Sequence, residues 1–252
     1  MQHLSGPSLL DHIDERHKRV LLDRGVDRRL EKGDILYLAG DSSPRVHIVV
    51  RGFAKLTARD DEGRETILGL AVPGDLIGEV AALDGGDQPL DAVALTRCDL
   101  IGFDARVLED IVAASPAVGL ELSRMLAIRM RVMCETAVER TSVEVPARLA
   151  GRLLWLAELL GRMEGGTIEL DLPLAQGDLG RLAGMCRESA CKTLRSFKAQ
   201  GVVDYRGRHL RILRPDALHR IKCSGWSAAE PDGVARTTGG SEKFFREISR
   251  KR

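Results

Sequence analysis

The sequence predicts an α+β protein built from three consecutive parts: an all-β roll, one long helix, and a helical unit that ends in a β-hairpin. Short apolar runs separated by glycine fill residues 30–103, an unbroken helical pattern follows residue 115, and two short helical patterns lie in a basic segment at 176–215. The predicted divisions are a roll with an N-terminal helix at 1–114, the long helix at 115–144, a winged helix-turn-helix at 145–222 and a disordered tail at 223–252.

The roll is predicted from runs of four to eight residues with Gly, Asp and Pro between them, as in GDILYLAGD and PGDLIGE. This pattern is typical of a small barrel or roll rather than of helices. Residues 8–24 precede these runs and carry apolar residues at helical spacing, so we expect a short helix packed on the roll.

The long helix begins at Ser115 and Pro116, because serine is a favoured N-cap and proline suits the first helical position. The stripe predicted to pair with a second subunit consists of Val118, Leu122, Met125, Arg129, Val132 and Thr136. Its spacing alternates between four and three residues, as in a coiled coil. A helix lying on its own domain is the alternative, but about 40 Å of helix exceeds a small roll, so we expect a homodimer.

Charge is distributed unevenly along the chain. Residues 1–110 hold 14 Lys and Arg against 21 Asp and Glu, a net charge of −7, whereas 176–215 hold 9 against 3, a net charge of +6. A local basic block on a nearly neutral chain indicates a module that binds phosphates, because Lys and Arg displace condensed counterions from nucleic acid. The alternative is a solvated basic face.

A DNA-reading helix is predicted within the basic block. Two short helices separated by Gly184 would pack through Leu179, Leu182 and Ala183 of the first and Ala190, Leu194 and Phe197 of the second. The opposite face of the second helix is charged, and Arg and Glu in its first turn suit base edges in the major groove. The predicted DNA-binding residues are Gln176, Arg187, Glu188, Ser189, Cys191, Lys192, Arg195 and, in the following hairpin, Arg208.

Two motifs carry a resemblance to a known family. A glycine scaffold comprises GDILYLAGD (33–41), Gly52, Gly63 and PGDLIGE (73–79), and the basic block reads QGDLGRLAGMCRESACKTL (176–194). From about residue 11 to 221 the chain resembles the CRP/FNR family, bacterial regulators named for the cyclic AMP receptor protein and the fumarate and nitrate regulator. The resemblance implies a cyclic-nucleotide-binding-like roll and a dimer on double-stranded DNA, with half-sites about 34 Å apart. It also implies RNA polymerase as a partner.

The same resemblance points to an effector site in the roll. Family members that bind cyclic nucleotides hold the phosphate with a Gly-Glu pair and an Arg-Ser pair, and Gly78 and Glu79 match the first pair. Gln88 and Pro89 stand at the places of the second pair, which removes a charge-assisted contact to a cyclic phosphate. Met133 and Cys134 stand where the long helix would approach the base. These six residues form the predicted effector site, and it is degenerate for cyclic AMP.

Other functions are weighed against this interpretation. Five widely spaced cysteines without a CxxC pair indicate neither a zinc site nor a disulfide framework, and the first, Cys98, lies too late for an N-terminal iron-sulfur cluster. His47, the lone histidine in the roll strands, favours a structural role over haem or cupin chemistry, so we expect no enzyme. With no membrane-spanning run or signal peptide, a cytoplasmic protein is expected.

Several alternatives remain open at the level of regulation. The effector could be a cyclic nucleotide, a cyclic dinucleotide, or no ligand at all. The thiols Cys186 and Cys191, beside the basic helix, offer oxidation as another input. A regulatory module for a protein partner is the alternative without DNA, and weak salt dependence of binding would favour it.

Overall fold

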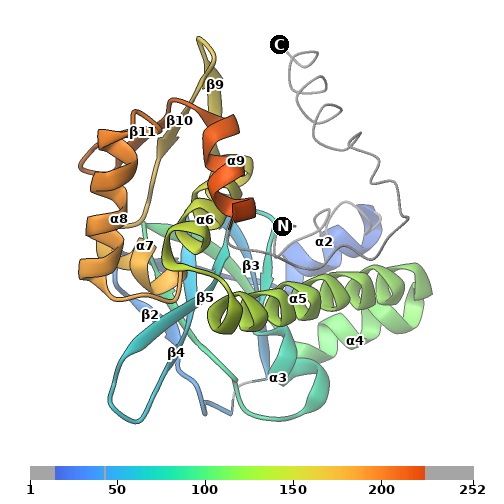
Figure 1. Ribbon diagram of the computed structural model, residues 1–252. Helices are drawn as coiled ribbons and strands as arrows, with labels where there is room; N and C mark the ends of the chain where they lie inside the picture. The colour runs from blue at the N-terminus through green and yellow to red at the C-terminus, as the bar shows by residue number, and fades with distance from the viewer. Residues whose placement is uncertain (1–14, 43, 225–252) are drawn as a thin grey trace, which may run out of the picture.

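The computed structural model describes residues 15–42 and 44–224, and it has the predicted α+β architecture (Figure 1). The roll lies at one end, the winged unit at the other, and the long helix crosses the roll between them. No helix within the described ranges is long and apolar enough to cross a membrane. The predicted tail from residue 225 onward and residues 8–14 of the predicted first helix lie outside the described residues.

The roll consists of two four-stranded antiparallel sheets. One has the order β1-β8-β3-β6 and the other β2-β7-β4-β5. Their bounds are β1 Val26–Leu30, β2 Ile35–Tyr37, β3 Arg45–Arg51, β4 Ala54–Arg59, β5 Glu65–Ala71, β6 Leu76–Ile77, β7 Asp91–Ala94 and β8 Cys98–Asp104. Alternating side chains of both sheets face inward, and Val49, Ile77 and Leu100 are almost fully buried in this core.

Three short helices flank the sheets: α2 (Glu15–Arg24), α3 (Glu79–Asp84) and α4 (Ala105–Ala114). The first was predicted, whereas α3 and α4 were not. The carboxylate of Asp104 caps α4 by accepting a hydrogen bond from the amide of Arg106, and Leu108 and Ile111 are buried one turn apart. That cap and spacing were readable in the sequence as a helix start.

Helix α5 (Pro116–Ser142) is 27 residues long, and it begins after the predicted N-cap Ser115. The prediction for its apolar stripe was wrong. Val118, Leu122, Met125 and Val132 are at most 7% exposed within the single subunit, and Thr136 is buried against α6. Arg129 forms an ion pair inside the subunit with Glu79. Because this face covers the roll and α4, it has almost no surface left to pair with a second subunit.

The winged unit combines four helices and one sheet. Its elements are α6 (Val145–Leu160), β9 (Arg162–Glu164), β10 (Thr167–Asp171), α7 (Gln176–Leu182), α8 (Arg187–Ala199), β11 (Val203–Arg206), β12 (His209–Ile212) and α9 (Pro215–Ser224). The sheet order is β11-β12-β10-β9, and α9 packs along α6 (Figure 1). The β11–β12 hairpin was predicted, whereas β9, β10 and α9 were not.

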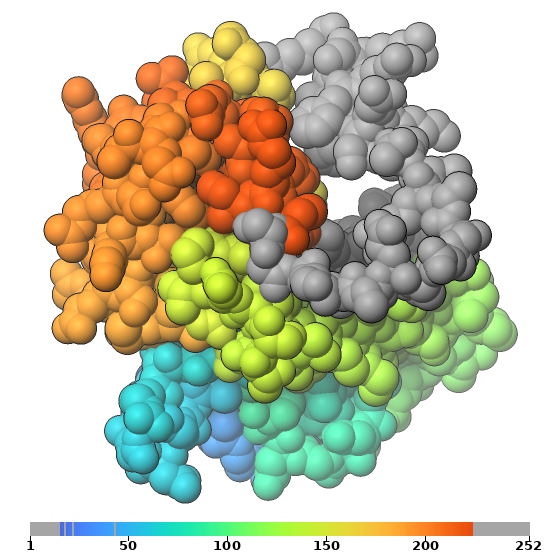
Figure 2. All heavy atoms as spheres, viewed as in Figure 1, coloured from blue at the N-terminus to red at the C-terminus, as the bar shows by residue number. Residues whose placement is uncertain are grey.

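The roll and the winged unit share one apolar core. Ile67 and Leu70 of β5 are 1% exposed and belong to the same buried cluster as Leu149, Leu179 and Phe197. Helix α7 rests directly on β5. In the space-filling view the orange winged unit stands on the blue-green roll, with the yellow-green end of α5 between them on this face (Figure 2). The position of the winged unit therefore depends on apolar contacts with the roll.

Candidate nucleic-acid interface and effector site

The helix-turn-helix is assembled as its apolar pattern predicts. Leu179, Leu182 and Ala183 of the first helix and turn are buried, as are Ala190, Leu194 and Phe197 of α8. Gly184 adopts a left-handed backbone with φ of +63° in the turn, which glycine permits without steric cost. This turn sets α8 against α7 and leaves the opposite face of α8 at the surface.

The exposed face of α8 carries four charged side chains that have no counterion among the described residues. Arg187, Glu188, Lys192 and Arg195 are exposed. Throughout the part of the chain that the structure describes, none of these four side chains forms an ion pair. Their charges are therefore available to an external partner. Because Arg187 and Glu188 occupy the first turn of α8, they lie where a groove-inserted helix presents side chains to bases.

The remaining predicted residues of this surface are half-buried and make local contacts. The Cys186 thiol and the Ser189 hydroxyl lie 3.1 Å apart, and the thiol of Cys191 donates to the amide oxygen of Gln176 over 3.4 Å. These contacts link the start of α8 to α7. The hydroxyl of Ser189 and hydrogen bonds from nearby backbone amides lower the pKa of the Cys186 thiol below its ordinary value.

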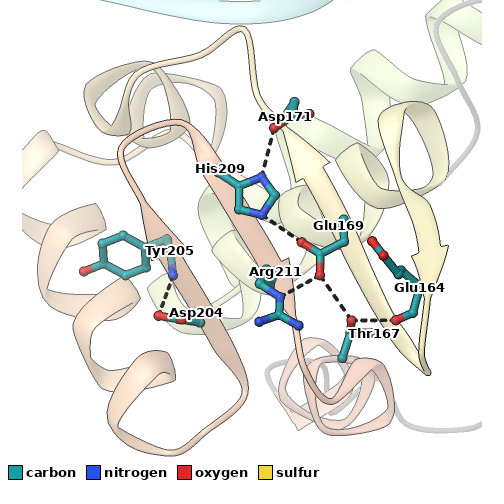
Figure 3. A network of polar contacts seen from close by, with 8 residues as sticks. All are labelled: Glu164, Thr167, Glu169, Asp171, Asp204, Tyr205, His209 and Arg211. Carbon is teal, nitrogen blue, oxygen red and sulfur yellow. Dashed lines mark hydrogen bonds and ion pairs between the residues drawn. The ribbon is translucent and has the colours of Figure 1, made fainter.

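The wing is a two-residue hairpin, with Gly207 at φ of +60° and Arg206 paired with His209. Two of its basic side chains are held by carboxylates of β10, a strand that was not among the predicted elements. His209 lies between Asp171, at 2.9 Å, and Glu169, at 2.8 Å, and Arg211 donates to Glu169 over 2.6 Å (Figure 3).

The carboxylates divide the wing into compensated and uncompensated charges. His209 and Arg211 of β12 are paired with carboxylates of β10, and the hydrogen bond with Asp171 raises the pKa of His209 above its ordinary value. Arg206 and the predicted DNA-binding residue Arg208, at the tip, are exposed and form no ion pair with any described residue. The tip is thus the part of the wing that can neutralise a phosphate.

In the roll, Gly78 and Glu79 lie at the start of α3. Gly78 has φ of +83°, and a Cβ there would approach the carbonyl oxygen of Arg45 to 2.6 Å, so the turn requires glycine. Glu79 is 4% exposed, and its carboxylate is paired with the guanidinium of Arg129 from α5. The same guanidinium donates to the carbonyl of Leu76 over 2.7 Å. The charge of Glu79 is therefore neutralised from within the subunit.

The structure separates the other predicted effector residues into two groups. Gln88 is 2% exposed, and its amide nitrogen lies 3.5 Å from the Cβ position of Gly78, so it belongs to the same interior as Glu79. Pro89, Met133 and Cys134 are exposed instead. Within the single subunit, Met133 and Cys134 therefore lie at the surface of α5, away from this interior.

Two aromatic residues near the effector site were not assigned to it from the sequence. The rings of Tyr37 and His47 lie 6.5 Å apart, and the Tyr37 ring also lies beside Gly78. Burial lowers the pKa of His47 to about 4, with Arg28 and Arg45 contributing, and burial raises the pKa of Tyr37. Both residues are therefore neutral core groups near neutral pH. In the sequence, strand alternation alone could have placed them inward.

A roll of this kind, joined by a long helix to a winged helix-turn-helix with an uncompensated charged surface, defines a DNA-binding transcription regulator. Comparison with known families agrees. Residues 27–115 match the family described as "Cyclic nucleotide-binding domain", and residues 147–221 match "Crp-like helix-turn-helix domain". The chain belongs to the CRP/FNR family of transcription regulators.

Individual relatives and solved structures are similar to this chain over most of its length. The "CRP-like cAMP-activated global transcriptional regulator" of Mycobacterium tuberculosis is 29% identical over 189 residues, covering 75% of this chain and 84% of the relative. The "Fumarate and nitrate reduction regulatory protein" of Escherichia coli is 24% identical, covering 81% and 82%. Among solved structures, a CooA mutant from Carboxydothermus hydrogenoformans has a TM-score of 0.71 at 20% identity, covering 89% and 96%.

Proposed function

We propose that this regulator binds a two-fold DNA operator as a homodimer and reads it with α8. The observation that carries the proposal is the set of exposed side chains on α8, Arg187, Glu188 and Lys192, which have no ion pair among the described residues. An arginine can pair with O6 and N7 of guanine, and a glutamate can accept from N4 of cytosine. Ser189, Gln176 and Arg208 would contact phosphates, which position the unit without reading sequence.

We propose that the outer face of α5 forms the dimer contact, in place of the inner stripe that covers the roll. Leu120 and Met130 are 53% and 69% exposed. Exposed small or apolar side chains recur along this face, first after seven residues and then at three- and four-residue spacing: Leu120, Ala127, Met130, Cys134, Ala137 and Thr141. A helix of 27 residues is about 40 Å long, enough for a coiled-coil contact with a second copy.

For the effector, we propose that the roll does not respond to cyclic AMP. The relative from M. tuberculosis is named as activated by cyclic AMP. Here Gln88 brings no positive charge for a phosphate, and Glu79 is already paired with Arg129. A cyclic dinucleotide or an unliganded, constitutively competent state are the candidates that replace it. Oxidation of Cys186 is a further candidate, favoured by its exposed position before α8 and its lowered pKa.

The function is tested by selecting a duplex from a random pool and measuring its affinity by fluorescence anisotropy at increasing salt. We expect the selected duplex to have a two-fold symmetric sequence. Its affinity should fall steeply as salt is added, with a slope of log K against log salt concentration of about −0.9 per phosphate neutralised. Failure to bind any duplex, or salt-insensitive binding, would instead favour a module for a protein partner. Calorimetry with cyclic AMP and with a cyclic dinucleotide tests the effector separately.

Two further parts of the proposal rest on the family to which the chain belongs. RNA polymerase is the expected protein partner, and the cytoplasm is the expected location.

The proposed division of the chain assigns residues 1–114 to sensing, 115–144 to dimerisation and 145–222 to DNA binding. Retention of the selected duplex by a 145–222 fragment, without dimerisation, would support that division.

A further inference from the structure

Three arginines gather at the elbow where α5 ends and α6 begins. Arg148 donates to the carbonyl oxygen of Arg140 over 2.9 Å, and Arg152 donates to Glu139 over 2.9 Å and to the hydroxyl of Thr136 over 3.1 Å. The stem of Arg140 lies against the helix-turn-helix, where its Nε is 3.1 Å from the Cβ position of Gly184. The cluster therefore touches both the long helix and the turn that precedes α8.

The guanidinium groups of Arg140 and Arg148 are incompletely satisfied by the described residues. Nε and Nη2 of Arg140 and Nε of Arg148 are buried atoms with no hydrogen-bond acceptor among the described residues. Burial, together with the positive charge of Arg148, lowers the pKa of Arg140. Buried donors of a charged group are costly to leave unpaired, so a native protein retains them where an ion, a water or a ligand supplies the acceptor.

A cavity of about 410 Å³ opens beside the cluster. Its basic lining residues are Arg148 and Lys222 of α9, and its apolar lining includes Val138, Val143 and Ala147. Glu135 and Glu139 also line it, but Glu139 is held by Arg152. Counting Arg140 and Arg152 of the cluster, four basic side chains lie at or near the cavity, against the two carboxylates of its lining. An apolar wall lies beside them.

We propose that this elbow cavity binds a small organic phosphate, whose anionic group is held by the lining residues Arg148 and Lys222 and attracts the guanidinium of Arg140 behind them. A phosphate offers several acceptor oxygens and up to two negative charges, which match converging guanidinium and ammonium donors better than a single chloride does. The cavity is larger than a bare phosphate needs, and its valines favour an apolar body on the ligand.

A ligand bound in this cavity would contact both the long helix α5 and the arginine that lies against the helix-turn-helix. Arg140 lies on Gly184 of the helix-turn-helix, while Cys134 and Val138 of the cavity also lie on the exposed face of α5. A ligand that draws the Arg140 guanidinium toward the cavity changes its contact with the turn before α8. The site is separate from Glu79 and Gln88 in the roll, so it would be a second regulatory input.

The test uses the full chain without DNA, so that its outcome is independent of operator binding. Thermal unfolding is followed with phenyl phosphate, with inorganic phosphate, and with phenol as the uncharged control. At ten times the dissociation constant, phenyl phosphate should raise the Tm of the wild type by about 3–6 °C. Inorganic phosphate should give a smaller shift, and phenol none.

Variants decide whether the named residues bind the anion. Lys222→Gln keeps most of the side-chain stem and should weaken phenyl phosphate about tenfold by calorimetry, whereas Arg220→Gln, on the same helix but exposed, should not. Arg140→Met should lose the ligand-induced shift without lowering the Tm in phosphate-free buffer, because it removes buried, unpaired donors. Absence of any shift in the wild type, or wild-type affinity in both Lys222→Gln and Arg140→Met, would overturn the proposal.

Discussion

The charged groups of α8 and those of the roll interior differ in what neutralises them. Arg187, Glu188 and Lys192 are exposed and form no ion pair with any described residue, whereas Glu79 is buried and paired with Arg129. An unpaired surface charge costs little in water and is free to meet a partner, while a buried one must be compensated internally. The difference indicates that the proposed DNA-reading surface can meet a partner, whereas the predicted effector carboxylate is already paired within the subunit.

The largest effect is expected from charge reversal on α8. Arg187→Glu combined with Lys192→Glu should weaken binding to the selected duplex by about 30-fold to 20,000-fold, since each good base contact contributes about 1–3 kcal/mol. Fluorescence anisotropy measures the change. Arg106→Glu, at an exposed site of α4, is the matched control and should bind as the wild type does. Equal affinity of the double variant would remove α8 from the interface.

Breaking the internal pair should cost stability rather than DNA contacts. Glu79→Gln leaves the Arg129 guanidinium buried without its counterion, and the free energy of unfolding in urea should fall by about 3–5 kcal/mol. Asp216→Asn removes an exposed pair with Arg220 and should cost at most about 1 kcal/mol. Similar losses in the two variants would contradict the buried, structural character of the Glu79 pair.

The two faces of α5 provide a related contrast. Leu122→Ala, on the inner face, should lower the free energy of unfolding by about 2–5 kcal/mol, because it opens a cavity against the roll. Leu120 is 53% exposed, so Leu120→Ala should change the free energy of unfolding of the monomer by less than about 0.5 kcal/mol. The same substitution should weaken dimerisation. Urea titration and light scattering separate these effects. A dimer weakened by Leu122→Ala alone would restore the inner stripe as the contact.

The smallest effect is expected at the wing, where charges are paired but exposed. Asp171 raises the pKa of His209 in the folded protein. The resulting stabilisation of the hairpin is therefore fully present below the unfolded pKa of about 6.5, and it is lost as the pH rises through the raised value. An NMR titration should place the imidazole midpoint above 6.5 in the wild type and nearer 6.5 in Asp171→Asn. An identical midpoint in both proteins would show that Asp171 does not raise the pKa of His209.

The sequence predicted the elements whose local pattern has one physical explanation. Pro116 after Ser115 began the long helix, and Gly184 separated α7 from α8, because each reflects a backbone requirement. The stripe on α5 was different. Helical periodicity marks a buried face but does not say what buries it, and the roll covers it here. Arg129 within that stripe was the available signal, since a charge on a buried face needs a counterion.

The effector site shows the same limit. The motif containing Gly78 and Glu79 marked a place for the predicted effector site but not the helix α3 that begins there, and the structure brings Gln88 beside it. No local pattern could place Arg129 against Glu79, fifty residues earlier, or Tyr37 beside Gly78. The alternation of acidic and apolar residues along β10 was likewise visible in the sequence. The pairing of its carboxylates with His209 and Arg211, however, depends on the strand order of the sheet.

The central claim is that two copies of α8 meet successive grooves of one duplex. It is tested most directly by the stoichiometry and affinity of the full chain on duplexes carrying both selected half-sites, at the selected spacing and with about five base pairs inserted between them. We expect two subunits per duplex and a large loss of affinity on insertion, which rotates one half-site to the opposite side of the helix. One subunit per duplex, or equal affinity at both spacings, would contradict it.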